Sequence, residues 1–118
     1  MILHKFIDII TDLKSISTSV KLPVEIEQDK TAFGIDGKII LGDIPVVRHD
    51  NFYDMDFNII LQYSTTKENV LSLMNKLHIL SELFVEDKRL LFDGWVKVDD
   101  ESKIIYQGTI VYKNIVSN

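Results

Sequence analysis

The side chains of this sequence that could do chemistry are, first, its three histidines. His4, His49 and His78 lie far apart along the chain, and none forms a recognised metal-binding spacing with another candidate ligand. The sequence has no cysteine, which excludes thiolate nucleophiles, disulfides and cysteine-ligated zinc or iron–sulfur sites and fits folding in a reducing cytoplasm. These residues predict neither a metal site nor a catalytic base.

Carboxylates are the second group that could do chemistry. Asp43, Asp50, Asp54 and Asp56 could bind a hard cation such as magnesium or calcium, but their spacing does not follow an EF-hand loop. The acidic run at 99–101 is typical of a polar turn between two strands. Because carboxylates are mostly exposed in folded proteins, solvated positions are the simpler interpretation of both groups.

Motifs of known catalytic or cofactor-binding sites are missing from the sequence. It contains no Gly-x-Ser-x-Gly element and no phosphate-binding loop. Trp95, Tyr106 and Tyr112 could stack on bases or sugars, but no arginine or lysine cluster accompanies them, so packing within a sheet explains them more simply. We therefore expect a binding or assembly protein that has no enzymatic activity and no cofactor.

Length and composition narrow the class of protein further. A chain of 118 residues with 46% hydrophobic residues can form one domain, residues 1–118, without disulfides or metals. The net charge of −5 is spread along the chain and leaves no basic stripe, which disfavours direct binding to nucleic acid. Asp8 and Asp12 interrupt the apolar N-terminal stretch, and no run approaches about 20 apolar residues, so we expect neither a signal sequence nor a membrane span.

The clearest elements are a long strand over 53–63 and a helix over 66–84. Apolar and polar residues alternate along the strand, and Thr65 with Glu68 has the spacing of a capping box. Ile79 and Leu83 fall outside the inward stripe of the helix, which suggests a second apolar contact such as a protein partner. The predicted inward stripe comprises Val70, Leu73, Met74, Leu77, Leu80 and Phe84.

The remaining elements complete an α+β fold. An amphipathic helix over 2–16 should fade within 15–18, and a short strand should follow at 24–28. Asp36-Gly37 suits the turn of a hairpin within 32–47, and a polar connection over 42–51 follows it. The segments 91–98 and 103–116 predict a terminal hairpin. The expected architecture is a mostly antiparallel sheet with an N-terminal helix and a second helix packed on it, in the order helix, strands, helix, hairpin.

This order of elements resembles the tail terminator, or tail-completion, proteins of bacteriophages and phage-tail-like particles. The local sequences that carry the resemblance are Phe52-Tyr53-Asp54-Met55-Asp56-Phe57, leading into Asn58-Ile59-Ile60-Leu61, and Tyr106-Gln107-Gly108-Thr109-Ile110-Val111-Tyr112. The resemblance covers nearly the whole chain.

The resemblance implies a structural protein of the virion tail, assembled in the bacterial cytoplasm. It implies a ring, typically of six subunits, that caps the tail tube, ends its growth and contacts the head connector or the sheath. A closed ring uses two different patches of each subunit, and Ile79 with Leu83 could be one of them. The loop over 42–51, with Asp43, Arg48, His49 and Asp50, is the candidate for contact with the tube or connector.

Three alternatives remain open from the sequence. One is another head–tail connector, such as a stopper protein. A second is a small enzyme or metal-binding domain that uses Asp54, Asp56 and His49 at one end of the sheet. A third is an inhibitor that occupies a host enzyme through an acidic surface, which the net charge of −5 permits.

Overall fold

The computed structural model describes the backbone of residues 2–42, 46–49 and 52–117 and the side chains of residues 7–42 and 57–112. It confirms the predicted α+β class and the order helix, strands, helix, strands. The elements are α1 (Ile2–Ser19), β1 (Lys30–Ala32), β2 (Ile35–Leu41), β3 (Val46–His49), β4 (Phe52–Thr65), the 3-10 turn η1 (Lys67–Asn69), α2 (Val70–Glu86), β5 (Leu90–Val98) and β6 (Ile104–Ser117).

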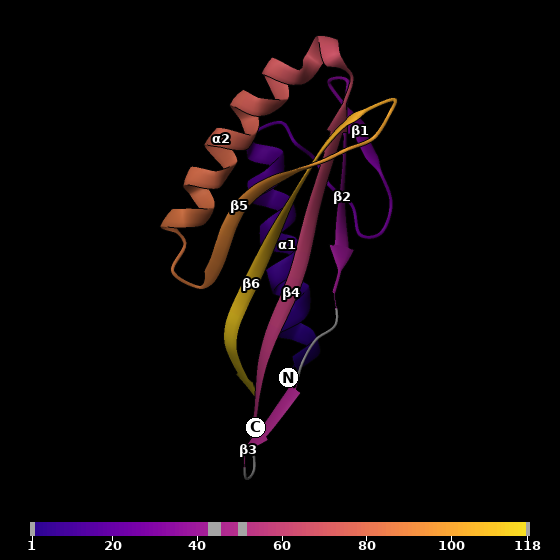
Figure 1. Cartoon of the computed structure of the whole chain (residues 1–118). Helices are drawn as coiled ribbons and strands as arrows, with labels where there is room; N and C mark the ends of the chain where they lie inside the picture. Colours follow the sequence, from indigo (N-terminus) through magenta and orange to yellow (C-terminus); the bar gives the residue numbers. More distant parts are fainter. Residues whose placement is uncertain (1, 43–45, 50–51, 118) are drawn as a thin grey trace.

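The sheet is built around β4, the strand that the alternating pattern predicted. Its order is β1-β2-β4-β6-β5, and β3 also pairs with β4. All pairs of strands are antiparallel. Along one edge of β4, β2 faces 59–65 and β3 faces 52–55, while β6 follows nearly the whole of the other edge. The long β4–β6 ribbon makes the molecule elongated, with extents of 54 × 26 × 21 Å (Figure 1).

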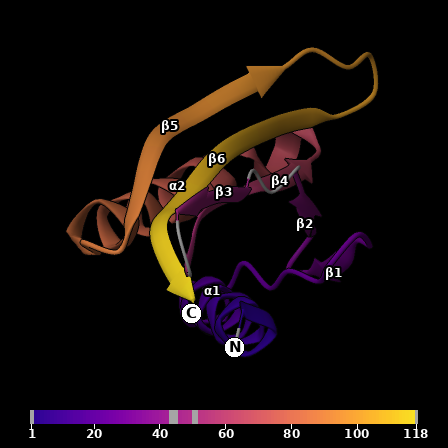
Figure 2. The ribbon, with the colours of Figure 1, turned by 90° about the horizontal axis from the view of Figure 1, so that it is seen from below.

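Both helices cover the same face of the curved sheet, and the other face is open (Figure 2). From Phe57 onward, the odd-numbered residues of β4 point into the core, and Phe57, Ile59, Leu61 and Tyr63 are fully buried there. Period-two alternation puts Asn58, Ile60 and Gln62, between these residues, on the open face. Strand β6 lies in the interior of the sheet, between β4 and β5.

The first helix continues past the hydroxyl-rich segment where it was expected to fade. The hydroxyls find partners without ending the helix: Ser19 donates to the carbonyl of Ile16 at 2.6 Å, and the Tyr63 hydroxyl donates to Ser17 Oγ at 3.2 Å. Ser17 is fully buried, and its hydrogen bond with Tyr63 links α1 to β4. The predicted strand over 24–28 is reduced to isolated bridges, Glu25 with Gln28 and Ile26 with Ile39.

The first hairpin turns at Phe33-Gly34, so the predicted turn at Asp36-Gly37 is wrong. Phe33 and Gly34 both have positive φ, 55° and 75°, while Asp36 and Gly37 lie within β2 opposite Thr31 and Lys30. Gly37 is needed there for space, because a Cβ atom would lie 2.8 Å from the ring of Tyr63. A glycine can stand in a sequence either because a turn requires it or because the backbone packs closely against a ring, and Gly37 is of the second kind.

The second helix begins differently from the prediction. Thr65 ends β4 and donates its hydroxyl to the carbonyl of Gly34 at 2.8 Å, and η1 precedes the helix. Thr65 is therefore not an N-cap, and the capping box predicted from Thr65 and Glu68 is not formed. The residues at the N-caps of η1 and α2 are Thr66 and Asn69, and neither makes a side-chain capping bond. The hydroxyl of Thr65 instead joins the start of the helical segment to the first hairpin.

Candidate interaction surface

Helix α2 has one buried stripe and unusually apolar flanks. Leu73, Leu77, Leu80 and Phe84 are buried as predicted, but Met74 is 48% exposed and does not belong to the core. The error has a geometric cause: Met74 follows Leu73 by one residue and is turned about 100° away from the buried stripe. The exposed apolar side chains of the helix are Leu71, Met74, Ile79, Leu83 and Val85.

Ile79 and Leu83 form the flank that the sequence singled out. Their side chains are 49% and 37% exposed, as expected for residues outside the inward stripe. They lie one turn apart, and Lys76 precedes Ile79 on the same flank by three residues. Elsewhere on the exposed side of the helix, His78 Nε2 and Glu82 Oε1 are paired at 3.1 Å. We name Ile79 and Leu83 the α2 flank.

Phe33 is an exposed aromatic residue that the sequence reasoning missed. It occupies the turn between β1 and β2, and 66% of its side chain is exposed. The Nζ atom of Lys21 lies 5.8 Å from the centroid of its ring, and that of Lys76 lies 4.9 Å away. Lys76 thereby places the ring beside the α2 flank. The dipeptide Phe33-Gly34 was the available signal for a turn, but Asp36-Gly37 is the commoner turn pair.

The loop predicted to contact a tube or connector is partly a strand. Arg48 and His49 belong to β3 and are opposite Tyr53 and Phe52 in the register with β4. Their side chains, and all of Asp43 and Asp50, lie outside the described residues. The β3–β4 hairpin is at the end of the molecule opposite to the β1–β2 turn (Figure 1), so the structure does not bring β3 together with that turn.

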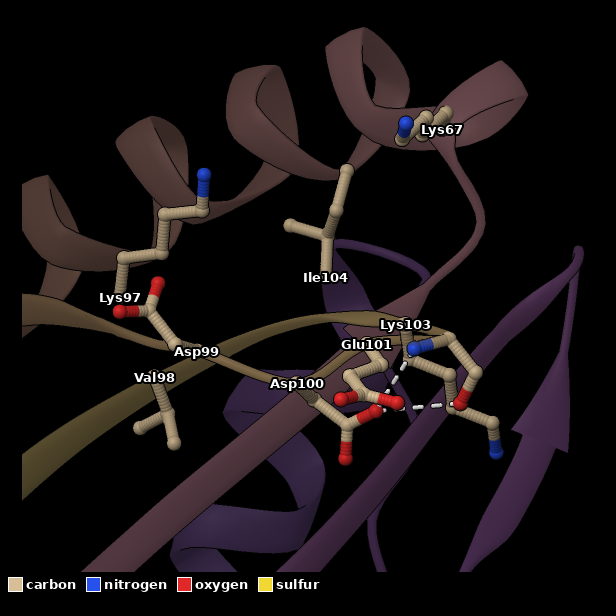
Figure 3. A pocket seen from close by; sticks show the side chains of 9 residues that line it. Lys67, Lys97, Val98, Asp99, Asp100, Glu101, Lys103 and Ile104 are labelled. Carbon is tan, nitrogen blue, oxygen red and sulfur yellow. Dashed lines mark hydrogen bonds between the residues drawn. The ribbon is translucent and has the colours of Figure 1, made fainter.

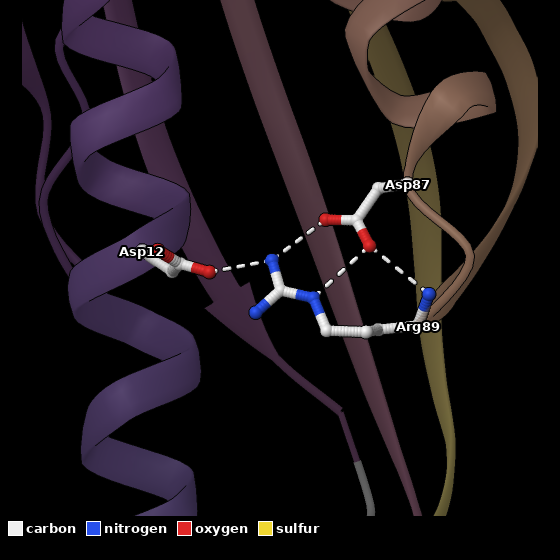
Figure 4. Close-up of polar contacts among 3 residues, drawn as sticks. All are labelled: Asp12, Asp87 and Arg89. Atoms are coloured by element: carbon white, nitrogen blue, oxygen red, sulfur yellow. Dashed lines mark hydrogen bonds and ion pairs between the residues drawn. The ribbon is translucent and has the colours of Figure 1, made fainter.

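An ion-pair cluster connects α1 to the segment between α2 and β5. Arg89 Nη2 contacts Asp12 Oδ2 at 2.6 Å and Asp87 Oδ2 at 2.7 Å, and Arg89 Nε donates to Asp87 Oδ1 at 3.0 Å (Figure 4). Hydrogen bonds from the Arg89 side chain hold the pKa of Asp87 below its ordinary value. The guanidinium group of Arg89 thus bridges the carboxylates of Asp12 and Asp87. This arrangement ties two elements together and leaves no free acid or base.

The acidic run at 99–101 forms the turn between β5 and β6. Asp100 Oδ1 accepts hydrogen bonds from the amide and the hydroxyl of Ser102, at 2.9 and 3.1 Å (Figure 3). These bonds hold the pKa of Asp100 below its ordinary value. Asp99 and Glu101 are exposed, and neither forms an ion pair with another described residue. The turn has the structural role that the sequence predicted and also presents two free carboxylates.

The candidate metal and stacking residues show no converging site where they can be observed. Among the described side chains, histidines and carboxylates nowhere form a group of three that could hold a metal ion. Asp54, Asp56 and His49 have side chains outside that part of the chain. Trp95 packs edge-on against Tyr63 and Phe92, and its Nε1 donates to the carbonyl of Leu77 at 3.1 Å, which confirms its interpretation as a packing residue.

The most prominent functional candidate among the described residues is thus an apolar surface with lysines beside it. Over the part of the chain that the structure describes, neither helix has the length and apolar composition needed to cross a membrane. No protein-family model matches the sequence, and a search of curated proteins found no match.

Proposed function

We propose that this protein is a tail terminator of a bacteriophage or phage-tail-like particle, which forms a ring that caps the tail tube. The observation that carries the proposal is the α2 flank. Ile79 and Leu83 are 49% and 37% exposed on a helix whose buried stripe already fills the core. Folding of one subunit does not require them to be apolar, whereas burial between subunits does.

A second uncovered surface supports assembly through unlike patches. On the open face of the sheet, Leu91 and Val96 of β5 are exposed. In register with Leu91, Val111 of β6 is half-buried. Helix α2, which carries the α2 flank, lies on one face of the sheet, and this sheet surface is on the other face (Figure 2). A ring of heterologous contacts needs such a pair of different patches, because each subunit uses one patch toward each neighbour.

The elongated subunit suits a ring that contacts different partners on its two sides. The β3–β4 hairpin, which contains Arg48 and His49, lies at one end of the long ribbon, and the β1–β2 turn lies at the other (Figure 1). One end would contact the last ring of the tail tube and the other the head connector or sheath. In this proposal the protein acts by shape and by order of assembly, without chemistry.

The test is assembly on isolated tail tubes, followed by electron microscopy. Wild-type protein should appear as a ring at one end of each tube and should prevent further addition of tube subunits. The variant with Ile79→Asp and Leu83→Asp should remain a folded monomer that does not cap tubes, because charged groups cannot be buried unpaired at an interface. A ring that binds the connector and ignores the tube would instead identify a stopper protein.

A matched control uses the other exposed apolar residues of the same helix. Leu71→Asp with Val85→Asp makes the same change in charge at positions that are 72% and 73% exposed. This variant should still form rings, because its substitutions lie away from the α2 flank. Wild-type monomers that bind neither tube nor connector would contradict the proposal.

A further inference from the structure

Phe33 has a backbone conformation that folding alone does not explain. Its φ of 55° lies in the left-handed region, which glycine adopts without strain and an aromatic residue does not. Its ring is also 66% exposed and therefore contributes little to the core. A residue that strains the backbone and exposes apolar surface suggests a function, as strained positions at binding sites often do.

Two lysines give this exposed ring a positive environment. Lys21 and Lys76 approach the ring from different elements, at 5.8 and 4.9 Å from Nζ to the centroid. Neither lysine forms an ion pair with any described residue. An aromatic ring with two unpaired ammonium groups is suited to an acidic protein segment. We name Lys21, Phe33 and Lys76 the Phe33 tip.

A segment of complementary charge exists in the same chain. The β5–β6 turn exposes Asp99 and Glu101, which are also without ion pairs among the described residues. The turn follows the edge strand β5, whereas the Phe33 tip adjoins the opposite edge strand, β1. Both are at the same end of the molecule, where Lys103, just before β6, contacts Asp36 of β2 at 3.4 Å (Figure 1).

We propose that the Phe33 tip of one copy binds the acidic β5–β6 turn of the next copy, with Lys21 and Lys76 facing Asp99 and Glu101. Opposite edges of neighbouring subunits meet when copies are placed side by side around a ring, so one contact of this kind repeats at every interface. The inference rests on the proposed ring and specifies one of its contacts. Charge complementarity would fix which edge meets which.

Complementary charge reversal tests this contact on the full-length chain. One variant carries Lys21→Glu and Lys76→Glu, and a second carries Asp99→Lys and Glu101→Lys. Asp100 is left unchanged because it holds the turn through Ser102. In sedimentation experiments, each variant alone should associate more weakly than wild type by roughly tenfold or more. A mixture of the two in equal amounts should recover assembly, since subunits that alternate around a ring restore opposite charges at every contact.

Two further variants separate this contact from general effects of charge and folding. Lys88→Glu reverses an exposed lysine between α2 and β5 and should assemble like wild type. Phe33→Gly should keep or raise the unfolding temperature, because glycine relieves the strained φ, and should nevertheless weaken assembly. Normal assembly of the charge-reversed variants, failure of their mixture to recover, or a wild type that is monomeric even in the presence of tail tubes would overturn the inference.

The same experiment distinguishes this inference from the proposed function. Rings that depend on the charge pairs but do not bind tail tubes would support the contact and reject the terminator function. Rings that cap tubes regardless of all these substitutions would support the terminator function and reject the contact.

Discussion

The buried stripe and the exposed flanks of α2 are built from the same kinds of residue but have opposite environments. Leu80 and Phe84 are fully buried against the sheet, while Ile79 and Leu83, each one residue away from them, are 49% and 37% exposed. A difference of 100° around the helix axis separates the two sets. The number of apolar residues in a helix therefore does not define the core, and the proposed ring gives Ile79 and Leu83, but not every exposed apolar residue of α2, a partner.

The largest effect on stability is expected in the buried stripe. Phe84→Ala should lower the free energy of unfolding by about 3–5 kcal/mol, because it leaves a cavity between α2 and the ring of Phe92, whose centroid lies 5.2 Å from that of Phe84. Urea unfolding followed by circular dichroism measures the change. A loss below about 1 kcal/mol, the level of ordinary surface substitutions, would show that this side of the helix is not well packed.

A smaller loss is expected where the backbone of β2 meets the core. Gly37→Ala should destabilise the fold by about 1–3 kcal/mol, because the added methyl group overlaps the ring of Tyr63 and the carbonyl of Pro23. The control is Gly94→Ala, where a Cβ meets nothing within 4 Å and only the positive φ of 100° is unfavourable. If Gly37→Ala were neutral, the ring of Tyr63 would have room to move.

Removing an unpaired polar group from the core should raise the free energy of unfolding, whereas the two preceding substitutions lower it. The hydroxyl of Tyr112 is buried and has no hydrogen-bond partner among the described residues, and burial raises its pKa to about 12. Tyr112→Phe should therefore stabilise the protein by about 1 kcal/mol, since it removes an unpaired buried group. Thermal unfolding of both proteins at neutral pH measures the difference. A destabilised variant would reveal a partner for the hydroxyl.

The smallest effect on stability is expected at the α2 flank. Ile79→Asp with Leu83→Asp should change the free energy of unfolding of the monomer by no more than about 1 kcal/mol, because both side chains are already partly in water. Circular dichroism and urea unfolding at a concentration where the protein is monomeric measure this. Global unfolding of the variant would place both side chains in the core and remove the contrast between the two sides of α2.

Much of the fold could be predicted because its strongest signals are local. Alternation identified β4, three- and four-residue spacing identified α2, and a four-residue polar segment located the β5–β6 turn. The turn at Phe33-Gly34 and the strand β3 were missed, because both depend on pairing with neighbouring strands. The sequence could not rank Asp36-Gly37 against Phe33-Gly34 without knowing that Tyr63 packs on Gly37.

The candidate site likewise has one part that could be predicted from the sequence and one part that could not. The exposure of Ile79 and Leu83 could be predicted, because it follows from helical geometry and the position of the inward stripe. The grouping of Phe33 with Lys21 and Lys76 could not, because three elements far apart in the chain supply these residues.

The sequence by itself therefore determined the class of fold, the two helices, the long central strand and the apolar flank of α2, all of which depend on periodicity along the chain. The tertiary structure decided the turn of the first hairpin, the role of Gly37, the exposure of Met74 and the aromatic tip between two lysines. These features depend on which segments approach one another in space, and the spacing of residues along a chain does not specify such contacts.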